Sequence, residues 1–194
     1  ALIPDGATVM IGGFMGVGTP ERVVDELVRQ RKRDLTVIAN DNAMPGVGIG
    51  KLVSAGLVRK TIVSHIGLNP ETQKKMLAGE MEVELVPQGN LAERIRAAGA
   101  GIGAFFTPTG YGTDLATGKE VRELDGRMQV FETPIHADFA FIKAERGDRW
   151  GNLTYRMTAR NFGPVMATAA KVTIATVHEV VMLGALDPEA VVTP

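Results

Sequence analysis

The sequence contains no cysteine, and this absence removes several classes of site at once. Disulfide frameworks, thiolate nucleophiles and metal centres with cysteine ligands are excluded. The net charge is only −1 at pH 7, so no excess of basic residues indicates a nucleic-acid or anionic-membrane partner. No apolar run reaches the roughly 18 residues of a membrane-spanning helix, and no signal peptide is visible. We therefore expect a cytoplasmic protein without a membrane or nucleic-acid partner.

What is present is ordinary for a globular protein. Apolar residues make up 45% of the 194 residues and charged residues 22%. This length is enough for one well-buried domain, and no internal repeat or low-complexity linker divides it. We expect one domain over residues 1–194, with both termini trimmed because the chain starts beside a strand and stops abruptly.

Apolar runs alternate with helical patterns along the chain. The expected strands are Thr8–Ile11, Leu35–Ala39, Thr61–Ser64, Val83–Val86, Ala104–Thr107, Phe139–Ala144 and Val172–Thr176. The expected helices are Pro20–Gln30, Val47–Ala55, Pro70–Ala78, Leu91–Ala98 and Ala159–Ala170. Strand followed by helix, several times over, predicts an α/β fold of three layers: an open, mostly parallel sheet with helices on both faces. The polar stretch from Gly110 to Gly126 is interpreted as a long excursion within the domain.

The most informative local feature is the glycine-rich loop between the first strand and the first helix, residues 12–18. Glycines allow positive φ and close approach of a ligand to the backbone. Thr19 is placed to cap the following helix, and Pro20 suits its first turn. Free N–H groups and the helix dipole would then face a phosphate or carboxylate. The loop therefore predicts an anion cradle.

Glycines alone leave other interpretations open. The spacing departs from G-x-G-x-x-G because Glu21 stands at the last glycine position, although Asp41 follows the second strand, the usual place of a ribose-binding acid. Gly50-Lys51-Leu52 lacks the Ser/Thr of a P-loop and does not follow a strand. The glycines could also serve only tight strand-to-helix packing.

Two amide side chains also stand after predicted strands. Gln88 follows Pro87 on a short loop, and Asn90 with Glu93 resembles a capping box that would start the next helix. Donors at such a loop can stabilise a developing oxyanion, although Gln88 could equally be an ordinary turn residue. Asn40 follows the second strand and could simply form a turn.

The whole opening stretch resembles the signature of family I CoA-transferase alpha subunits. Asp5-Gly6, three apolar residues, Gly12-Gly13-Phe14, Gly18 and Pro20 satisfy it throughout. The resemblance continues along almost the entire chain, with further similar blocks at residues 86–96, 107–113, 151–155 and 159–162. Within that family, the chain looks similar to alpha subunits of succinyl-CoA:3-oxoacid, 3-oxoadipate and acetate/acetoacetate transferases. The resemblance implies a CoA-transferase/ribose-phosphate-isomerase-like sheet.

The resemblance also implies a site and a substrate class. It assigns thioester positioning to Gln88 as the catalytic residue, and CoA binding to Gly12, Gly13, Phe14, Met15, Gly16, Val17, Gly18 and Asn40. CoA would be a substrate moved from succinyl-CoA or acetyl-CoA to a short 3-oxo acid, so no cofactor and no metal is expected. The first half of the chain looks closer to the acetate group and the second half to the succinyl-dependent group, which leaves the donor open.

In this family the nucleophilic glutamate belongs to a beta subunit, within a Glu-x-Gly setting. The one match in this chain is Glu145-Arg146-Gly147, inside the charged stretch Lys143–Arg149 that we interpret as an exposed turn. We therefore expect half of an active site, completed by a beta subunit in a heterodimer or an α2β2-type assembly.

Three other functions stay open. A sugar-phosphate binder or isomerase on a related fold would use the glycine loop equally well, but it would need a carboxylate base and a lysine in the crevice, and the sequence shows no such pair. The second alternative is an NAD-dependent oxidoreductase, and the third is a non-catalytic paralogue that only pairs with a partner. His65, His136 and His178 lack metal-ligand spacing, and only His65 ends a strand near the expected crevice, where a structural role is favoured.

Overall fold

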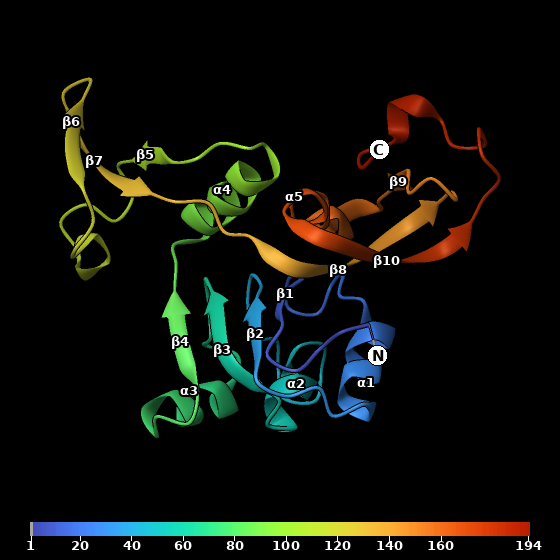
Figure 1. Ribbon diagram of the computed structural model, residues 1–194, viewed down its shortest axis with the longest axis horizontal. Helices are drawn as coiled ribbons and strands as arrows, with labels where there is room; N and C mark the ends of the chain where they lie inside the picture. The colour runs from blue at the N-terminus through green and yellow to red at the C-terminus, as the bar shows by residue number, and fades with distance from the viewer. Residues whose placement is uncertain (1) are drawn as a thin grey trace.

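The computed structural model describes residues 2–194 and contains two sheets (Figure 1). The main sheet has the order β10-β8-β1-β2-β3-β4, all neighbours parallel, with β9 antiparallel to β8. Its strands are β1 Thr8–Ile11, β2 Leu35–Ile38, β3 Val58–Val63, β4 Glu82–Leu85, β8 Ala137–Gly147, β9 Leu153–Thr154 and β10 Ala170–Val180. The helices are α1 Glu21–Arg29, α2 Gly50–Ser54, α3 Pro70–Leu77, α4 Gln88–Gly99 and α5 Gly163–Thr168, with 3-10 turns η1 Asp114–Ala116, η2 Met157–Arg160 and η3 Pro188–Ala190.

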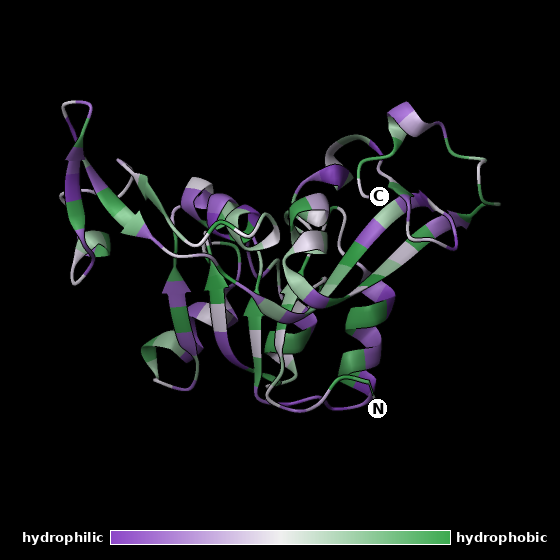
Figure 2. Ribbon diagram, turned by 45° about the horizontal axis from the view of Figure 1, so that its top comes forward, coloured by the Kyte–Doolittle hydropathy of each residue, from purple (hydrophilic) through white to green (hydrophobic). Residues whose placement is uncertain are grey.

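The three expected layers follow from the alternation of side chains along the strands. Val9 and Ile11 of β1 belong to a core shared with α1 and α2, whereas Met10 between them belongs to a second core shared with α4 and α5. In Figure 1, α4 and α5 lie above β8 and α1 and α2 lie below it. A sheet buried on both faces explains why β1 and β2 are mostly apolar, as Figure 2 shows.

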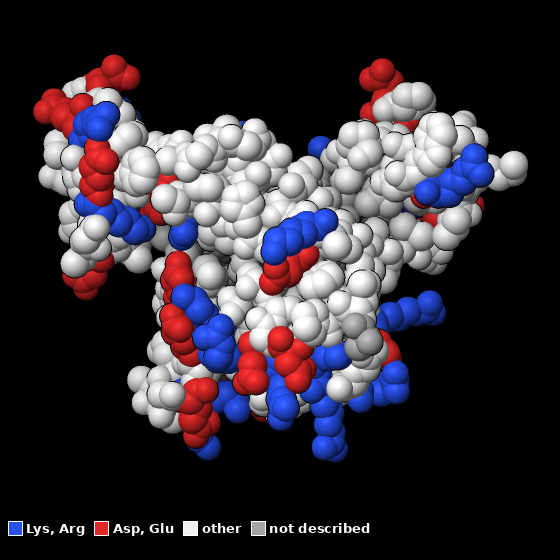
Figure 3. Space-filling view, in the orientation of Figure 1, with Lys and Arg blue, Asp and Glu red and all other residues white. Residues whose placement is uncertain are grey.

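Strand β4 ends the sheet on one side and has a different composition. Its Glu82 and Glu84 both pair with Lys60 Nζ on β3, at 2.7 and 3.0 Å. Figure 2 accordingly shows this strand as hydrophilic, and Figure 3 shows acidic and basic side chains side by side over it. Charged side chains on an edge strand discourage pairing with another chain.

The stretch after α4 departs from the sequence prediction. Residues 104–107 were expected to be one strand of the alternation, and residues 110–126 an excursion. Instead β5 Phe105–Thr107, β6 Val121–Leu124 and β7 Arg127–Glu132 form a separate antiparallel sheet in the order β5-β7-β6. Asp125 and Gly126 both have positive φ and make the tight hairpin turn between β6 and β7. An Asp-Gly pair between two strands is a local signal of such a hairpin.

This small sheet projects beyond α4 and is attached to it by one buried carboxylate (Figure 1). Glu132 is only 3% exposed and accepts hydrogen bonds from Asn90 Nδ2 at 3.2 Å and Lys119 Nζ at 2.7 Å. Arg94 Nε lies 3.7 Å from its other oxygen. A buried charge needs such partners, so the cluster fixes the small sheet against α4.

Four further local predictions are wrong. Thr19 does not cap α1: the N-cap is Pro20 without a side-chain bond, and Thr19 is buried. The expected helix over residues 159–170 is divided into η2 and α5, and the expected helix over residues 47–55 is α2 with only five residues. The stretch Lys143–Arg149 is not an exposed turn, because β8 continues to Gly147 between β10 and β9.

Among residues 2–194, no helix is long and apolar enough to cross a bilayer.

Asp138 joins the start of β1 to the edge strand β10, and this link is expected to be sensitive to acid. Its carboxylate accepts from Lys171 Nζ at 2.8 Å and from the Thr8 N–H at 3.1 Å. The Lys171 bond, and to a smaller extent the Thr8 bond, lowers the pKa of Asp138 below the ordinary value of an aspartate. A carboxyl whose folded pKa is lowered stabilises the fold above its unfolded pKa, and this contribution is lost as the pH falls through the folded pKa.

We therefore expect Asp138→Asn to flatten the loss of stability as the pH falls below about 4. The effect should be small because the carboxyl is 38% exposed. Urea unfolding midpoints of both proteins across this range measure it, with Asp114→Asn on the exposed turn η1 as the control. An unchanged slope in Asp138→Asn would contradict the assignment.

Candidate active site

The amide side chains of Asn40 and Gln88, which both follow predicted strands, meet at the carboxyl edge of the sheet. Gln88 Nε2 donates to Asn40 Oδ1 at 2.5 Å, although 48 residues separate them. Asn40 follows β2 and Gln88 follows β4, and the ends of parallel strands lie on one edge. Ser64, after β3, bonds the Asn40 carbonyl with its hydroxyl at 2.8 Å and its N–H at 2.9 Å. Asn40 is therefore held by side chains and backbone from two neighbouring strand ends.

The sequence predicted Gln88 on a short loop, and this prediction is wrong. Gln88 is the first residue of α4. The expected capping box is absent because the helix begins earlier. Asn90 lies inside the helix and bonds Thr109 and Glu132, while Glu93 pairs with Arg96. The first N–H groups of a helix have no partner within it, and the helix dipole favours negative charge there. The amide nitrogen of Gln88 carries a second hydrogen besides the one given to Asn40.

The glycine-rich loop is a tight hairpin rather than an open cradle. Phe14 and Val17 exchange backbone hydrogen bonds at 3.0 and 2.9 Å, and Met15 and Gly16 between them have φ of 51° and 87°. The Gly12 N–H donates to the Phe141 carbonyl at 2.9 Å. The expectation of free loop N–H groups is therefore wrong for Gly12, Phe14 and Val17, since their donors are used within the protein.

Two polar side chains from distant segments hold this hairpin. Asp41 Oδ2 accepts the Met15 N–H at 2.9 Å and the Asn40 amide at 2.7 Å. Asn161 accepts the Gly13 N–H at 3.2 Å and donates to the Val17 carbonyl at 3.0 Å. Asp41 is thus a structural clamp that links the loop to Asn40, and both of its oxygens have hydrogen-bond partners within the protein. The sequence showed its position after a strand, but nothing local indicated its partner.

The hairpin presents apolar side chains outward. Phe14, Met15 and Val17 are 43%, 48% and 50% exposed. Phe14 stands between two hollows. One, of ≈ 390 Å³, is lined by Phe14, Gln88, Gly89, Ala92, Asn161, Phe162 and Val165. The other, of ≈ 620 Å³, is lined by Phe14, Met15, Val17, Thr158 and Asn161. Both fall within the size range of ligand sites, and their apolar walls meet a few polar groups at Gln88 and Asn161.

The remaining candidates lie elsewhere or stay isolated. His65, His136 and His178 are all exposed, and among residues 2–194 no group of three or more His, Asp or Glu residues could hold a metal ion. Glu145 lies on β8 and lines neither hollow at Phe14. Tyr155 also lines neither hollow; burial raises the pKa of its phenol, whose oxygen lies 2.8 Å from Thr193 Oγ1.

Comparison with known proteins supplies the family. The model of the family described as "Coenzyme A transferase" matches residues 1–194. The chain is 58% identical over 194 residues to the A subunit of 3-oxoadipate CoA-transferase from Pseudomonas putida, covering 99% of this chain and 84% of that protein. It is 54% identical over 190 residues to the alpha subunit of acetate CoA-transferase from Escherichia coli (strain K12), covering 98% and 86%.

A solved structure agrees on the fold. The acyl-CoA transferase of Escherichia coli O157:H7, in a thioester complex with CoA, superposes with a TM-score of 0.86 at 24% identity. The match covers 99% of this chain but 43% of that longer chain. Neither the sugar-phosphate alternative nor the NAD-dependent one is favoured by these matches. The expected fold class is confirmed, and the chain belongs to the coenzyme A transferase family.

Proposed function

We propose that this chain is the alpha subunit of a 3-oxoacid CoA-transferase. It would move CoA from succinyl-CoA or acetyl-CoA to a short 3-oxo acid, in an active site shared with a beta subunit. The observation that carries the shared site is the lining of the two hollows at Phe14: it includes the Gln88 amide but no carboxylate. A covalent mechanism through a carboxylate then needs that group from a partner. The relatives, which are named as single subunits of their enzymes, support the same division.

The proposed reaction divides one transfer into carboxylate exchanges. A glutamate carboxylate of the partner attacks the thioester carbonyl of the acyl-CoA, and the C–S bond breaks to give an acyl anhydride and CoA thiolate. The thiolate then attacks the glutamyl carbonyl, releasing the first acid as its carboxylate and leaving a glutamyl-CoA thioester. The acceptor carboxylate takes the CoA by the reverse of these steps. CoA is a substrate throughout, so the proposal requires no metal or dissociable cofactor.

Within this proposal, Gln88 is the catalytic residue of the chain. Each carbonyl addition places negative charge on an oxygen, and preorganised donors stabilise such an oxyanion. The second Nε2 hydrogen of Gln88 and the N–H groups at the start of α4 would serve here, while Asn40 orients the Gln88 amide through the bond described above. The hairpin from Gly12 to Gly18, with Phe14, Met15 and Val17 outward, would contact the CoA chain through apolar surface rather than through its N–H groups.

The complete enzyme is proposed to be a heterodimer or an α2β2-type assembly. Acyl-CoA and short carboxylic or 3-oxo acids are its small-molecule partners. We also propose a cytoplasmic location, which the absence of cysteine from the sequence supports.

The partner requirement is directly testable. We expect the chain alone to give no transfer between succinyl-CoA or acetyl-CoA and acetoacetate, because it lacks the carboxylate that forms the covalent intermediate. Adding a beta-type chain should restore transfer, and intact-mass spectrometry should place the CoA adduct on the beta chain. Testing both donors and several acids names the substrates. Robust transfer by this chain alone would contradict the shared site.

A further inference from the structure

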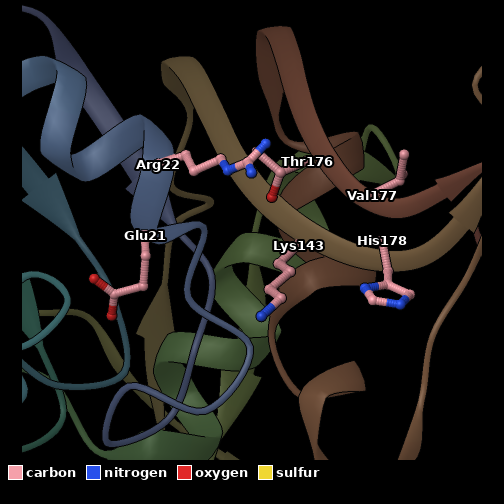
Figure 4. Close-up of a pocket in the computed structure, with 6 residues that line it drawn as sticks. All are labelled: Glu21, Arg22, Lys143, Thr176, Val177 and His178. Carbon is pink, nitrogen blue, oxygen red and sulfur yellow. The ribbon is translucent and has the colours of Figure 1, made fainter.

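A third hollow, of ≈ 510 Å³, lies away from the two at Phe14 and shares no lining residue with them. It is lined by Glu21, Arg22, Lys143, Thr176, Val177 and His178 (Figure 4). These residues come from three elements far apart in the sequence: the start of α1, the middle of β8 and the second half of β10. The proposed transfer uses none of them.

The strand register explains how the basic groups come together. Lys143 of β8 and Thr176 of β10 are direct neighbours in the parallel pair, and His178 follows on the same face two residues later. Figure 4 shows Lys143 and His178 projecting side by side, while Arg22 reaches from α1 toward Thr176. Two cations, an imidazole and a hydroxyl therefore border one hollow.

The positive charge in this hollow is not balanced. Arg22 and Lys143 have no carboxylate oxygen within 4.0 Å among residues 2–194. The one carboxylate that lines the hollow, Glu21, pairs with Lys51 Nζ at 2.6 Å and shares that ammonium with Asp25, so it is not paired with Arg22 or Lys143. Nearby basic residues behave differently, since Lys171 pairs with Asp138 at 2.8 Å and Arg146 with Glu179 at 3.0 Å.

We propose that Arg22, Lys143, Thr176 and His178 form an anion site that binds a phosphate or diphosphate group. A guanidinium suits phosphate oxygens by forming paired hydrogen bonds, and an ammonium adds a point charge. The N-terminal end of α1, where Arg22 is the second residue, adds a favourable dipole. The volume lies within the range of ligand sites. The group could belong to CoA, in which case the inference rests on the proposed function, or to a separate phosphorylated metabolite.

Inorganic pyrophosphate is the probe for this site, titrated into the full chain by calorimetry. We expect Arg22→Ala and Lys143→Ala each to weaken pyrophosphate binding by about tenfold, because each removes a charge-assisted hydrogen bond. Lys171→Ala is the matched control: it also removes a lysine from this part of the sheet, but one outside the hollow. All three side chains are exposed, so the variants should fold.

The histidine signals give an independent readout. The chain has three histidines, so the ring signal of His178 can be assigned by its loss in His178→Asn. Pyrophosphate should shift that signal in the wild type but not in the Arg22→Ala/Lys143→Ala double variant. Absence of binding, or equal weakening by Lys171→Ala, would overturn the proposal.

Competition identifies the source of the group. If CoA displaces pyrophosphate and pantetheine, which has no phosphate, does not, the site binds the phosphates of CoA. If pyrophosphate binds while CoA fails to displace it, the site is still an anion site but takes another phosphorylated ligand. Because neither measurement uses a transfer assay or a beta chain, failure here is distinguishable from failure of the proposed function.

Discussion

Gln88→Glu is expected to lower the kcat of CoA transfer by about 10²–10³-fold in the complex with a beta subunit. Glutamate keeps the size of the side chain but replaces its N–H donors with a carboxylate. The variant therefore loses the donor proposed for the oxyanion and places a negative charge where another develops. It also turns the bond to Asn40 Oδ1 into a repulsive contact between oxygens. Steady-state kinetics with each acyl-CoA donor measure the change.

The division between kcat and KM distinguishes catalysis from binding. Loss of a donor that acts only in the transition state lowers kcat and kcat/KM equally, so the KM for acyl-CoA should change little. Gln88→Ala removes the donor without adding a charge and should be less severe. Gln30→Ala, at the exposed end of α1, is the control and should keep full activity. A Gln88→Ala enzyme with normal kcat would exclude the proposed role.

Gly13→Ala is expected to destabilise the fold by about 3 kcal/mol. Gly13 has φ of +127°, and an added Cβ would lie 2.1 Å from Oγ1 of the buried Thr19 and 3.2 Å from its nitrogen. Either the hairpin or the entry into α1 would have to move. Because Phe14 borders both hollows, CoA binding should weaken together with stability. Urea unfolding and calorimetric titration with CoA measure the two effects.

Two further variants separate the clash from the effect of backbone conformation. Gly6 also has positive φ, +77°, but an added Cβ there meets nothing within 4 Å, so Gly6→Ala should cost about 1 kcal/mol. In the double variant Gly13→Ala/Thr19→Ala, the closest contact is absent and part of the stability should return. If Gly6→Ala and Gly13→Ala cost the same, close packing against Thr19 is not the reason for the glycine.

Much of the architecture could be predicted because it depends on local pattern. The alternation Val9-Met10-Ile11 determines which side chain faces which helical layer, and turn residues mark where the buried strands end. Parallel strands all end on one edge, which is why Asn40 and Gln88, both placed after strands by the sequence, lie in contact there. Helix boundaries were less predictable. Asn90, expected to cap the helix, lies inside it and donates its side-chain hydrogen bond to Glu132, a residue 42 positions away.

The character of the glycine loop could not be predicted from the loop itself. Its N–H groups were expected to be free for an anion, but Asn161 takes that of Gly13 across 148 residues of sequence, and Asp41 takes that of Met15. The same limit applies to the small antiparallel sheet and to the cluster of Arg22, Lys143 and His178. Each depends on side chains or strands that come together only when the chain closes.

By itself, then, the sequence determined the layered α/β sheet, its coenzyme A transferase family and the residues at the strand ends. Those features follow from hydrophobic periodicity, turn chemistry and a motif of consecutive residues, which are local. The tertiary structure alone decided that the loop presents apolar side chains, that Gln88 begins α4, and that unpaired cations gather beside α1 and β10. Hydrogen-bond partners and charge balance are properties of residues distant in sequence, so only the folded chain determines them.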